Sequence, residues 1–396
     1  MVRNLKNLAH AFQSSIANFL YGSPGGKIVT IGVTGTDGKT TTASLIFHIL
    51  KVAGANPAMI TTVAAQIGDK VYDTGLHTTT PSAFTIQKYI KRAVDAGSNY
   101  LIVEVTSHAL DQNRVKGLNF KIGVLTNITH EHLDYHGTYE NYVRAKSKLL
   151  AASEISIINA DDSSYQKIKP LLSGQKISTY SLKKSDADFS LKSIGIKFPG
   201  GWEFNLQNFL AAVAVAKTVG IEDEKIEFAL KTFEFPKGRQ EIVYDQDFKI
   251  IIDFAHTPNS FANVLPELKK VTKGRLIHVF GAAGKRDSSK RPLMGEIAAK
   301  FDDIIILTAE DSRNEKIEQI NSQIKLGIKD YKGELMEIPD RQKAIDYAVR
   351  TAKKGDTIVI TGKGHEESMN LGHGEIPWSD HNAVKRAIEI LNGKDK

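Results

Sequence analysis

An apolar strand, a glycine-rich turn and a helix start follow one another near the N-terminus, and this run constrains the fold more than any other. It reads IVTIGVTGTDGKTTT over residues 28–42. Gly35 and Gly38 allow backbone N–H groups to turn toward an anion at a helix N-terminus. Lys39 adds a charge for the β- and γ-phosphates, and the Thr40 hydroxyl is placed to bind Mg²⁺. The run therefore predicts a phosphate-binding loop whose ligand is ATP.

Apolar strands alternate with amphipathic helices along the rest of the chain. The strand-like segments are Tyr100–Val105, Ile122–Asn127 and Ile155–Asn159, and then Ile250–Phe254, Leu276–Gly281, Ile304–Leu307 and Thr357–Thr361. Such alternation is typical of parallel sheets covered by helices. The predicted fold class is α/β, with a P-loop parallel-sheet central ATPase domain over residues 28–238 and a Rossmann-like C-terminal α/β domain over 239–396.

The length and composition fit a multidomain enzyme. At 396 residues the chain is longer than one hydrophobic core usually supports. It is 41% hydrophobic and 24% charged, without a run of 18 apolar residues. It has no cysteine, which excludes disulfides, thiol catalysis and cysteine-ligated metal sites.

The charge pattern indicates small anionic ligands rather than nucleic acid. The formal net charge is +7, but the basic residues are scattered among 45 acidic ones and form no basic run. An excess of cations suits polyanionic substrates such as ATP and a nucleotide-linked sugar peptide. Residues 1–25 lack the apolar region and cleavage pattern of a secretory signal, so a cytoplasmic location is expected.

Residues 1–27 are predicted to form an amphipathic helix segment ahead of the first domain. One face gathers apolar side chains at helical spacing, and Tyr21–Gly26 then ends the helix. The apolar residues are Leu5, Leu8, Phe12, Ile16 and Phe19. Two interpretations stay open, a helix docked on the first domain and a peripheral membrane contact through residues 3–20. Only Arg3, Lys6 and His10 could supply cations to a membrane surface.

Two further clusters follow strands of the first domain, at the sheet edge where ligands of such folds gather. Glu104 ends the strand that starts at Tyr100, and it is a good Mg²⁺ ligand. The run from Thr126 to Asp134 places histidines and carboxylates just after the strand Ile122–Leu125. This crowding indicates a functional edge.

A set of motifs in fixed order resembles the Mur ligases, the ATP-dependent amide-forming enzymes of bacterial cell-wall precursor synthesis. The stretches are GTDGKTTT, HTTTPS, EVTSHALDQNRV, NITHEHLDYHGTYENYVRAKSKL, FNLQNFLAA, GRQE, DFAHTP, GAAGKRDSSKRPLM and GKGHE. They cover residues 28–390. EVTSHAL, the Asp-Tyr-His-Gly run and GKGHE are most similar to the group that adds the third residue, meso-diaminopimelate or L-lysine, to the D-Glu of UDP-N-acetylmuramoyl-L-Ala-D-Glu.

The resemblance implies a site with two Mg²⁺ ions. Thr40 and Glu104 correspond to ligands of one ion, and Glu104, His132 and Lys146 to ligands of the second. Lys146 resembles the lysine that this family carbamylates. A carbamate is an oxygen-donor anion suited to a hard cation, whereas an ammonium group cannot bind one.

The resemblance also assigns the nucleotide and the sugar-peptide donor. For ATP it implies Gly35, Thr36, Asp37, Gly38, Lys39, Thr40 and Thr41 of the loop, Asn205 and Asn208 near the adenine, and Arg239 and Asp253 from the second domain, with His256 adjacent. For the donor it implies Thr79, Thr80, Thr106, Gln112 and Arg114. ATP is accordingly expected between the two domains, and the catalytic set is Lys39, Glu104, His132 and Lys146.

The acceptor end departs from the family pattern. Relatives that use diaminopimelate carry Asp-Asn-Pro-Arg, whereas this chain has Glu310-Asp311-Ser312-Arg313. Arg313 keeps a fork suited to an amino-acid carboxylate. Arg286, Asp311, Gly362 and Glu366 are the other acceptor positions that the resemblance implies. Asp311 in place of Asn adds one negative charge, so the identity of the acceptor stays open.

The expected reaction passes through an acyl phosphate, formed from the donor carboxylate and ATP and then attacked by the acceptor amine. The partners are a nucleotide-linked muramoyl dipeptide and a diamino acid, and a monomer is expected. The family's N-terminal uridine-diphosphate-binding domain is expected to be absent. Two alternatives stay open, a ligase of the folylpolyglutamate synthase type and a non-catalytic ATP-binding relative.

Overall fold

The structure is a computed structural model that describes residues 2–72, 80–129, 131–198 and 203–393. The chain divides into two compact units, Met1–Glu234 and Phe235–Lys396. The predicted domain limits at residues 27 and 238 stay predictions. Each unit has its own sheet and its own hydrophobic core, so each is described by itself.

A nine-stranded sheet forms the centre of the first unit, in the order β4-β3-β2-β5-β1-β6-β7-β8-β9. The strands are β1 (Val29–Thr34), β2 (Pro57–Ile60), β3 (Ala65–Ile67), β4 (Lys70–Tyr72), β5 (Tyr100–Glu104), β6 (Phe120–Leu125), β7 (Ser153–Asn159), β8 (Lys176–Ser181) and β9 (Phe189–Ser190). All neighbours are parallel except the pairs β2–β3 and β3–β4. Parallel strands bring their carboxyl ends to one edge, which is where the phosphate-binding loop lies.

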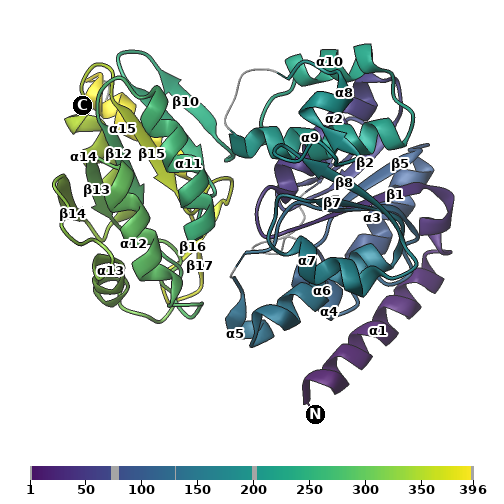
Figure 1. The fold of residues 1–396 in the computed structure, drawn as a ribbon. Coiled ribbons are helices and arrows are strands. Elements are labelled where there is room, and N and C mark those ends of the chain that lie inside the picture. Colours follow the sequence, from purple (N-terminus) through teal and green to yellow (C-terminus); the bar gives the residue numbers. More distant parts are fainter. Residues whose placement is uncertain (1, 73–79, 130, 199–202, 394–396) are drawn as a thin grey trace. The chain divides into compact units, whose positions relative to one another are not determined.

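Helices cover both faces of this sheet (Figure 1). They are α1 (Val2–Leu20), α2 (Lys39–Val52), α3 (Ala83–Asp95), α4 (Ser107–Asp111), α5 (Leu133–His136), α6 (Tyr139–Ala151), α7 (Tyr165–Ile168), α8 (Leu191–Ile194), α9 (Glu203–Thr218) and α10 (Asp223–Lys231), with 3-10 turns at Pro24–Lys27 and Lys169–Leu172. Helices α2, α9 and α10 pack together on one face. Helices α3, α4 and α6 lie on the other face, with α1 against α3.

The second unit is a six-stranded sheet in the order β10-β11-β15-β12-β13-β14, parallel apart from β10. Its strands are β10 (Glu241–Asp245), β11 (Lys249–Asp253), β12 (Leu276–Phe280), β13 (Ile304–Leu307), β14 (Glu334–Glu337) and β15 (Thr357–Thr361), and β16 (Ser368–Asn370) pairs with β17 (Glu375–Pro377). The helices are α11 (Pro258–Val271), α12 (Lys290–Phe301), α13 (Ile317–Lys325), α14 (Arg341–Thr351) and α15 (Asp380–Leu391). Helices α14 and α15 pack together against the sheet.

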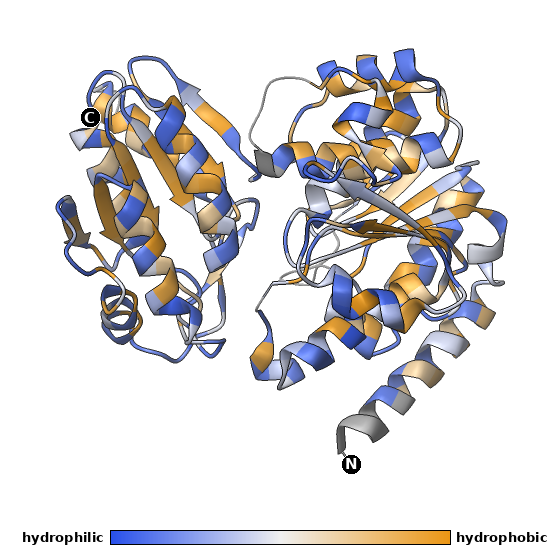
Figure 2. Ribbon diagram, in the orientation of Figure 1, coloured by the Kyte–Doolittle hydropathy of each residue, from blue (hydrophilic) through white to orange (hydrophobic). Residues whose placement is uncertain are grey.

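The predicted core strands of both units are confirmed, as β1, β5, β6, β7, β11, β12, β13 and β15. These strands are nearly continuous apolar runs because both of their faces are buried, as in β12, where all five residues are buried. Figure 2 shows the hydrophobic residues concentrated on these central strands. The prediction did not name β3, β4, β9 and β14, which are short and partly exposed and so leave no such run. It also did not name β2, β8, β10, β16 and β17.

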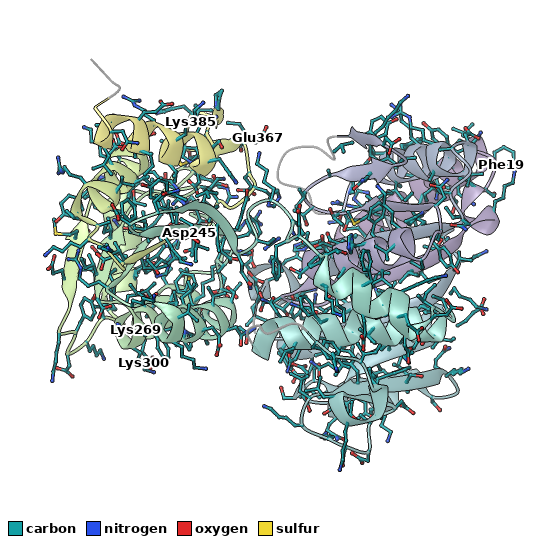
Figure 3. The ribbon with its side chains drawn as sticks, turned by 90° about the horizontal axis from the view of Figure 1, so that it is seen from above. Phe19, Asp245, Lys269, Lys300, Glu367 and Lys385 are labelled. Carbon is teal, nitrogen blue, oxygen red and sulfur yellow. The ribbon has the colours of Figure 1, made fainter. Side chains whose placement is uncertain are left out.

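Helix α1 docks on the first unit with the face opposite to the apolar one. Ala17 is fully buried, and the Ser14 hydroxyl donates to Asn113 O (2.7 Å). By contrast, 67% of Phe12 and 80% of Phe19 are exposed. Figure 3 shows the Phe19 ring pointing away from the ribbon. The docked helix is confirmed, but Phe12 and Phe19 do not make its contact, because the small side chains Ser14 and Ala17 allow closer packing.

The described helices include none that is both long and apolar enough to cross a membrane.

Candidate active site

The phosphate-binding loop is packed so tightly that two of its positions accept only glycine. A Cβ on Gly35 would lie 1.8 Å from the Thr126 hydroxyl. Gly38 has a φ of +79° and caps α2, and a Cβ there would lie 2.2 Å from Asn208 Oδ1. The turn can therefore form only with glycine at these two positions, and its N–H groups lie at the start of α2.

Thr126 and Asn127, the first two residues of the predicted functional run, connect this loop to the end of β6. The Thr126 hydroxyl donates to Asp37 O (2.6 Å), and Asn127 Oδ1 accepts from Asp37 N (3.0 Å). Thr36 N donates to Asn127 O (2.9 Å). The sequence analysis placed both residues at a functional edge but gave neither a role in holding the loop.

Two lysines of the site donate to main-chain carbonyls of the loop. Lys39 Nζ donates to Thr36 O (2.8 Å), and Lys146 Nζ to Gly35 O (2.6 Å). Burial, and then the nearby Lys39 charge, hold the pKa of Lys146 well below its usual range. A lowered pKa favours the neutral amine, which is the nucleophilic form of lysine.

Thr40 and Glu104 meet at the first turn of α2. The Thr40 hydroxyl donates to Glu104 Oε2 (2.9 Å), and the same oxygen accepts from Thr62 N (3.1 Å). Both side chains are buried, as is Thr41 beside them. A hydroxyl and a carboxylate beside a phosphate site are the hard oxygen donors that Mg²⁺ prefers, so these residues fit the ion.

His132 and Lys146 both approach the ring of Tyr142, which the sequence analysis did not single out. His132 has a φ of +55° at the start of α5, and its ring centroid lies 6.2 Å from that of Tyr142. Lys146 Nζ lies 4.6 Å from the same ring centroid. The described residues contain no group of three or more His, Asp or Glu side chains that could hold a metal.

The predicted donor residues form one hydrogen-bonded cluster. Thr80 Oγ1 lies 3.2 Å from Thr106 Oγ1, and Arg114 Nη1 donates to Thr80 O (2.9 Å). Arg114 Nε donates to Gln112 Oε1 (2.8 Å). Burial lowers the pKa of Arg114. Thr79, also predicted here, lies outside the described residues.

The donor cluster continues to a tyrosine and an aspartate that the sequence analysis missed. Gln112 Nε2 donates to the Tyr135 hydroxyl (3.2 Å), which donates to Asp111 Oδ2 (3.0 Å). Asn7 of α1 donates to the same Asp111 oxygen (3.1 Å). Helix α1 is thus connected to the donor cluster.

The two asparagines assigned to the nucleotide lie on α9. Asn205 and Asn208 are both buried, and Asn208 Oδ1 accepts from the Thr42 hydroxyl (3.3 Å). Asn208 lies against Gly38, so one of the two asparagines directly borders the phosphate-binding loop.

In the second unit, the predicted nucleotide residues border an aromatic ring. The Arg239 guanidinium lies 4.4 Å from the Phe254 ring centroid. Asp253 accepts from Gln240 N (2.8 Å) and Ala255 N (2.7 Å), which fixes its carboxylate. Burial raises the pKa of Asp253, and the Arg239 charge opposes that rise.

The acceptor residues of the second unit centre on a buried lysine from the GKGHE motif. Lys363 Nζ lies 2.9 Å from Asp311 Oδ1 and 2.5 Å from Glu366 Oε2. Asp311 Oδ1 also accepts from Asn370 N (3.1 Å). The charge that Asp311 adds to the site is therefore matched by Lys363.

Arg313 lies beside this group, whereas Arg286 does not join it in the described contacts. Arg313 has a φ of +51°, and its Nη1 donates to Gly284 O (2.6 Å). Gly362 has a φ of +104°, and a Cβ there would lie 2.7 Å from Glu310 Oε2. Arg286 is exposed on the loop after β12. The structure thus brings together four of the five predicted acceptor residues.

Two family models match the chain over most of its length. The Mur ligase middle domain matches residues 33–216, and the Mur ligase glutamate ligase domain matches residues 238–364. A relative from Aquifex aeolicus, a UDP-N-acetylmuramoyl-L-alanyl-D-glutamate–2,6-diaminopimelate ligase, is 40% identical over 95% of this chain and 80% of its own length. The chain belongs to the Mur ligase family. The ligase of the same name from Geobacillus kaustophilus is 37% identical to this Mur ligase over 94% of the chain and 81% of the relative.

Solved structures agree with this fold. A UDP-N-acetylmuramoyl-L-alanyl-D-glutamate–2,6-diaminopimelate ligase aligns with this Mur ligase at a TM-score of 0.62 and 30% identity, over 92% of this chain and 79% of that one. The folylpolyglutamate synthase of Mycobacterium tuberculosis, complexed with ADP, aligns at a TM-score of 0.69 and 16% identity, over 89% and 91% of the two chains. At that identity the second likeness supports the fold alone.

Proposed function

We propose that this Mur ligase joins a diamino acid, meso-diaminopimelate or L-lysine, to the D-Glu carboxylate of UDP-N-acetylmuramoyl-L-Ala-D-Glu in peptidoglycan precursor synthesis. One observation carries the proposal: Glu104 contacts both the donor cluster and the phosphate site. Thr80 Oγ1 donates to Glu104 O (3.2 Å), and Glu104 Oε2 accepts from Thr40. A carboxylate held by the donor cluster would thus lie near the phosphates of ATP. The names of the relatives supply the UDP-linked dipeptide and diaminopimelate, and L-lysine is the second acceptor that the sequence motifs imply.

In the first step, a donor carboxylate oxygen attacks the γ-phosphorus of ATP. The bond from that phosphorus to ADP breaks, which leaves an acyl phosphate and ADP. Lys39 and the N–H groups at the start of α2 stabilise the charge on the transferring group. Mg²⁺, held by Thr40 and Glu104, would supply further neutralisation.

In the second step, the acceptor amine attacks the acyl carbon. Phosphate leaves and the nitrogen loses a proton, so an amide is formed. Arg313 supplies a fork for the acceptor carboxylate, and Glu366 a carboxylate for an ammonium group. Lys363 and Asp311 keep these two groups in place through their ion pair.

Lys146 is proposed to react with CO₂ and so complete a second Mg²⁺ site with Glu104 and His132. Its depressed pKa supports this role, because only the neutral amine attacks CO₂. Intact-mass measurement of the native protein, with and without bicarbonate, should show one CO₂ added per chain, and Lys146→Arg should show none. A wild-type mass unchanged by bicarbonate would contradict the carbamate.

A peripheral membrane contact of α1 and a monomeric state in the cytoplasm stay proposals. The exposed Phe12, Phe19 and Leu20 support the contact, and residues 1–27 carry no acidic side chain. Cosedimentation with vesicles of anionic and of neutral lipids tests it. A protein that stays in the supernatant with both would contradict the membrane contact.

The deciding experiment measures ADP release by the purified protein with Mg²⁺, bicarbonate and the UDP-linked dipeptide, across meso-diaminopimelate, L-lysine and L-ornithine. We expect release that requires both the donor and one of these acceptors. ATP binding without donor-dependent release would contradict the ligase and favour a non-catalytic relative. Release with a folate and L-glutamate instead would favour the folylpolyglutamate type.

A further inference from the structure

A fully buried arginine, Arg341, lies under the acceptor edge of the second unit and has no role in the reaction steps proposed above. It is the first residue of α14, and Asp380 is the first residue of α15. The Arg341 guanidinium forks onto this carboxylate, with Nε 2.8 Å from Oδ1 and Nη2 2.7 Å from Oδ2. Both side chains have no exposed surface.

The remaining N–H groups of Arg341 reach two separate main-chain segments. Nη1 donates to Ala309 O (3.1 Å), and Nη2 donates to Thr361 O (2.9 Å). Ala309 directly precedes the acceptor loop Glu310–Arg313, and Thr361 directly precedes Gly362 of the GKGHE loop. One guanidinium therefore joins the starts of both acceptor loops.

The sheet itself does not join these loops. Strand β13 leads into the first loop and β15 into the second, and β12 lies between them. Strands that flank a common neighbour are about 10 Å apart and share no ladder hydrogen bonds. Beyond the strand ends, the distance between the two loops depends on side chains that contact both. Arg341 contacts the residue before each loop, and Lys363 of the second loop contacts Asp311 of the first.

Stability alone gives a poor account of this arrangement. A buried ion pair is often no more stabilising than apolar side chains of the same volume. A cation in the first turn of a helix also opposes the helix dipole. What the pair supplies is a planar fork with fixed directions, which lysine cannot reproduce.

The opposite edge of the same sheet holds a comparable pair. Arg275 Nη2 lies 2.7 Å from Asp356 Oδ2 and also donates to Thr351 O (2.8 Å). These residues precede the starts of β12 and β15, at the edge away from the acceptor residues. Arg275 thus offers a control: it is also an arginine paired with an aspartate, but it lies at the amino-terminal ends of the strands, away from the acceptor residues.

We propose that Arg341 is a positioning residue that sets acceptor affinity by fixing the separation of the loops Glu310–Arg313 and Gly362–Glu366. The inference rests on the proposed function, because the acceptor is the ligand of those loops. Displacing a binding group by about 1 Å costs on the order of 100-fold in such sites. The donor and ATP residues on the first unit are not held by Arg341.

The test compares Arg341→Lys with Arg275→Lys in the full chain, by measuring KM for the acceptor, the donor and ATP. For Arg341→Lys we expect the acceptor KM to rise about 10- to 100-fold, with donor and ATP KM within about threefold of wild type. For Arg275→Lys we expect the acceptor KM to stay within about threefold, even where its melting temperature falls. Equal effects of the two variants on acceptor KM would overturn the inference.

Trp378→Phe is a milder variant for use if Arg341→Lys does not fold. It removes the N–H that donates to Asp380 Oδ1 (2.9 Å) and keeps an aromatic ring. We expect a rise of about three- to tenfold in acceptor KM, and an unchanged value would contradict the inference. If the wild type shows no acceptor-dependent ADP release, the proposed function fails and the inference with it. If the wild type is active and the variants keep its acceptor KM, the inference about Arg341 is overturned while the proposed function stands.

Discussion

The carboxyl-terminal edges of the two sheets hold their cations in different ways. In the first unit, Lys39 and Lys146 donate to main-chain carbonyls of the phosphate-binding loop. In the second unit, Lys363 is bound by two carboxylates, and Arg341 by a third. We propose that the first edge keeps the positive charge of Lys39 for a polyanionic ligand. The second edge neutralises its charges internally and uses them to fix the shape of the site.

We propose that the difference reflects the charges of the two expected ligands, ATP at the first edge and an amino acid at the second. ATP carries several negative charges, so a cation already paired with a carboxylate would bind it more weakly. An amino acid carries both signs of charge, and recognition depends on the spacing of opposite charges in the site. Substitution of Lys39 at the first edge should consequently affect turnover with every acceptor, whereas substitution of Arg313 or Arg341 at the second edge should affect only the use of the acceptor.

The largest effect is expected at the first edge, from Lys39→Ala. Loss of the charge at the β- and γ-phosphates should lower kcat by on the order of 1000-fold, because that charge stabilises the transferring phosphoryl group. Single-turnover ADP formation with saturating donor measures the step. Lys51→Ala, an exposed lysine in the last turn of the same helix, is the control and should keep wild-type activity. Near-native turnover in the Lys39 variant would contradict the proposal that Lys39 stabilises the transferring phosphoryl group.

At the second edge, Arg313→Lys should raise the acceptor KM by about 10- to 100-fold and leave the ATP KM unchanged. Lysine keeps the charge but loses the fork that a carboxylate requires. Steady-state kinetics with each substrate varied in turn separates the two constants. Arg350→Lys, at an exposed position of α14, is the control. Parallel changes in ATP and acceptor KM would show that the two edges are not as distinct as proposed.

The pH dependence of stability offers a third test, at His365 in the GKGHE loop. Burial, reinforced by Arg239, lowers the pKa of His365 from 6.5 to about 3. The folded state therefore keeps this histidine neutral, while the unfolded chain binds a proton below about pH 6.5. The contribution of His365 to stability is thus complete above pH 6.5 and is lost as the pH falls toward 3, by up to about 1.4 kcal/mol per pH unit.

Replacement by a residue that does not titrate isolates this contribution. From pH 7 to pH 4.5, the free energy of unfolding should fall by about 2 kcal/mol more in the wild type than in His365→Asn. Denaturant titrations at the two pH values measure it. His373→Asn, at an exposed position, should follow the wild type. Identical pH dependence in the wild type and His365→Asn would show that the acceptor edge is not tightly packed around His365.

The smallest effect is expected from Phe19→Ser on α1, the helix that contacts the donor cluster through Asn7. Phe19→Ser should change the free energy of unfolding by less than about 0.5 kcal/mol, because the ring is exposed. Ala17→Asp should destabilise by about 2 kcal/mol or more, since a charge would enter a fully buried position. Thermal unfolding compares the two. A change in donor KM in Phe19→Ser would show that the exposed face of α1 contributes to donor binding.

The local sequence determined the elements and the residue types of both edges. Continuous apolar runs mark strands that are buried on both faces, so β12 and β15 could be predicted from their residues alone. Gly35 and Gly38 could be predicted for a similar local reason, because a tight turn at a helix start requires them. The motifs also indicated Thr40, Glu104, Lys146 and Glu366, whose chemistry depends on the residue type.

Only the tertiary structure decided which of these groups meet. Thr40 and Glu104 are 64 positions apart and Arg341 and Asp380 are 39 apart, and no periodicity encodes such pairs. Periodicity likewise predicted an apolar face on α1, but shape complementarity at Ser14 and Ala17 selected the opposite face for docking. The physical reason is that a local pattern fixes which side chains share a surface, whereas close packing and the burial of charge select the surface that each one contacts.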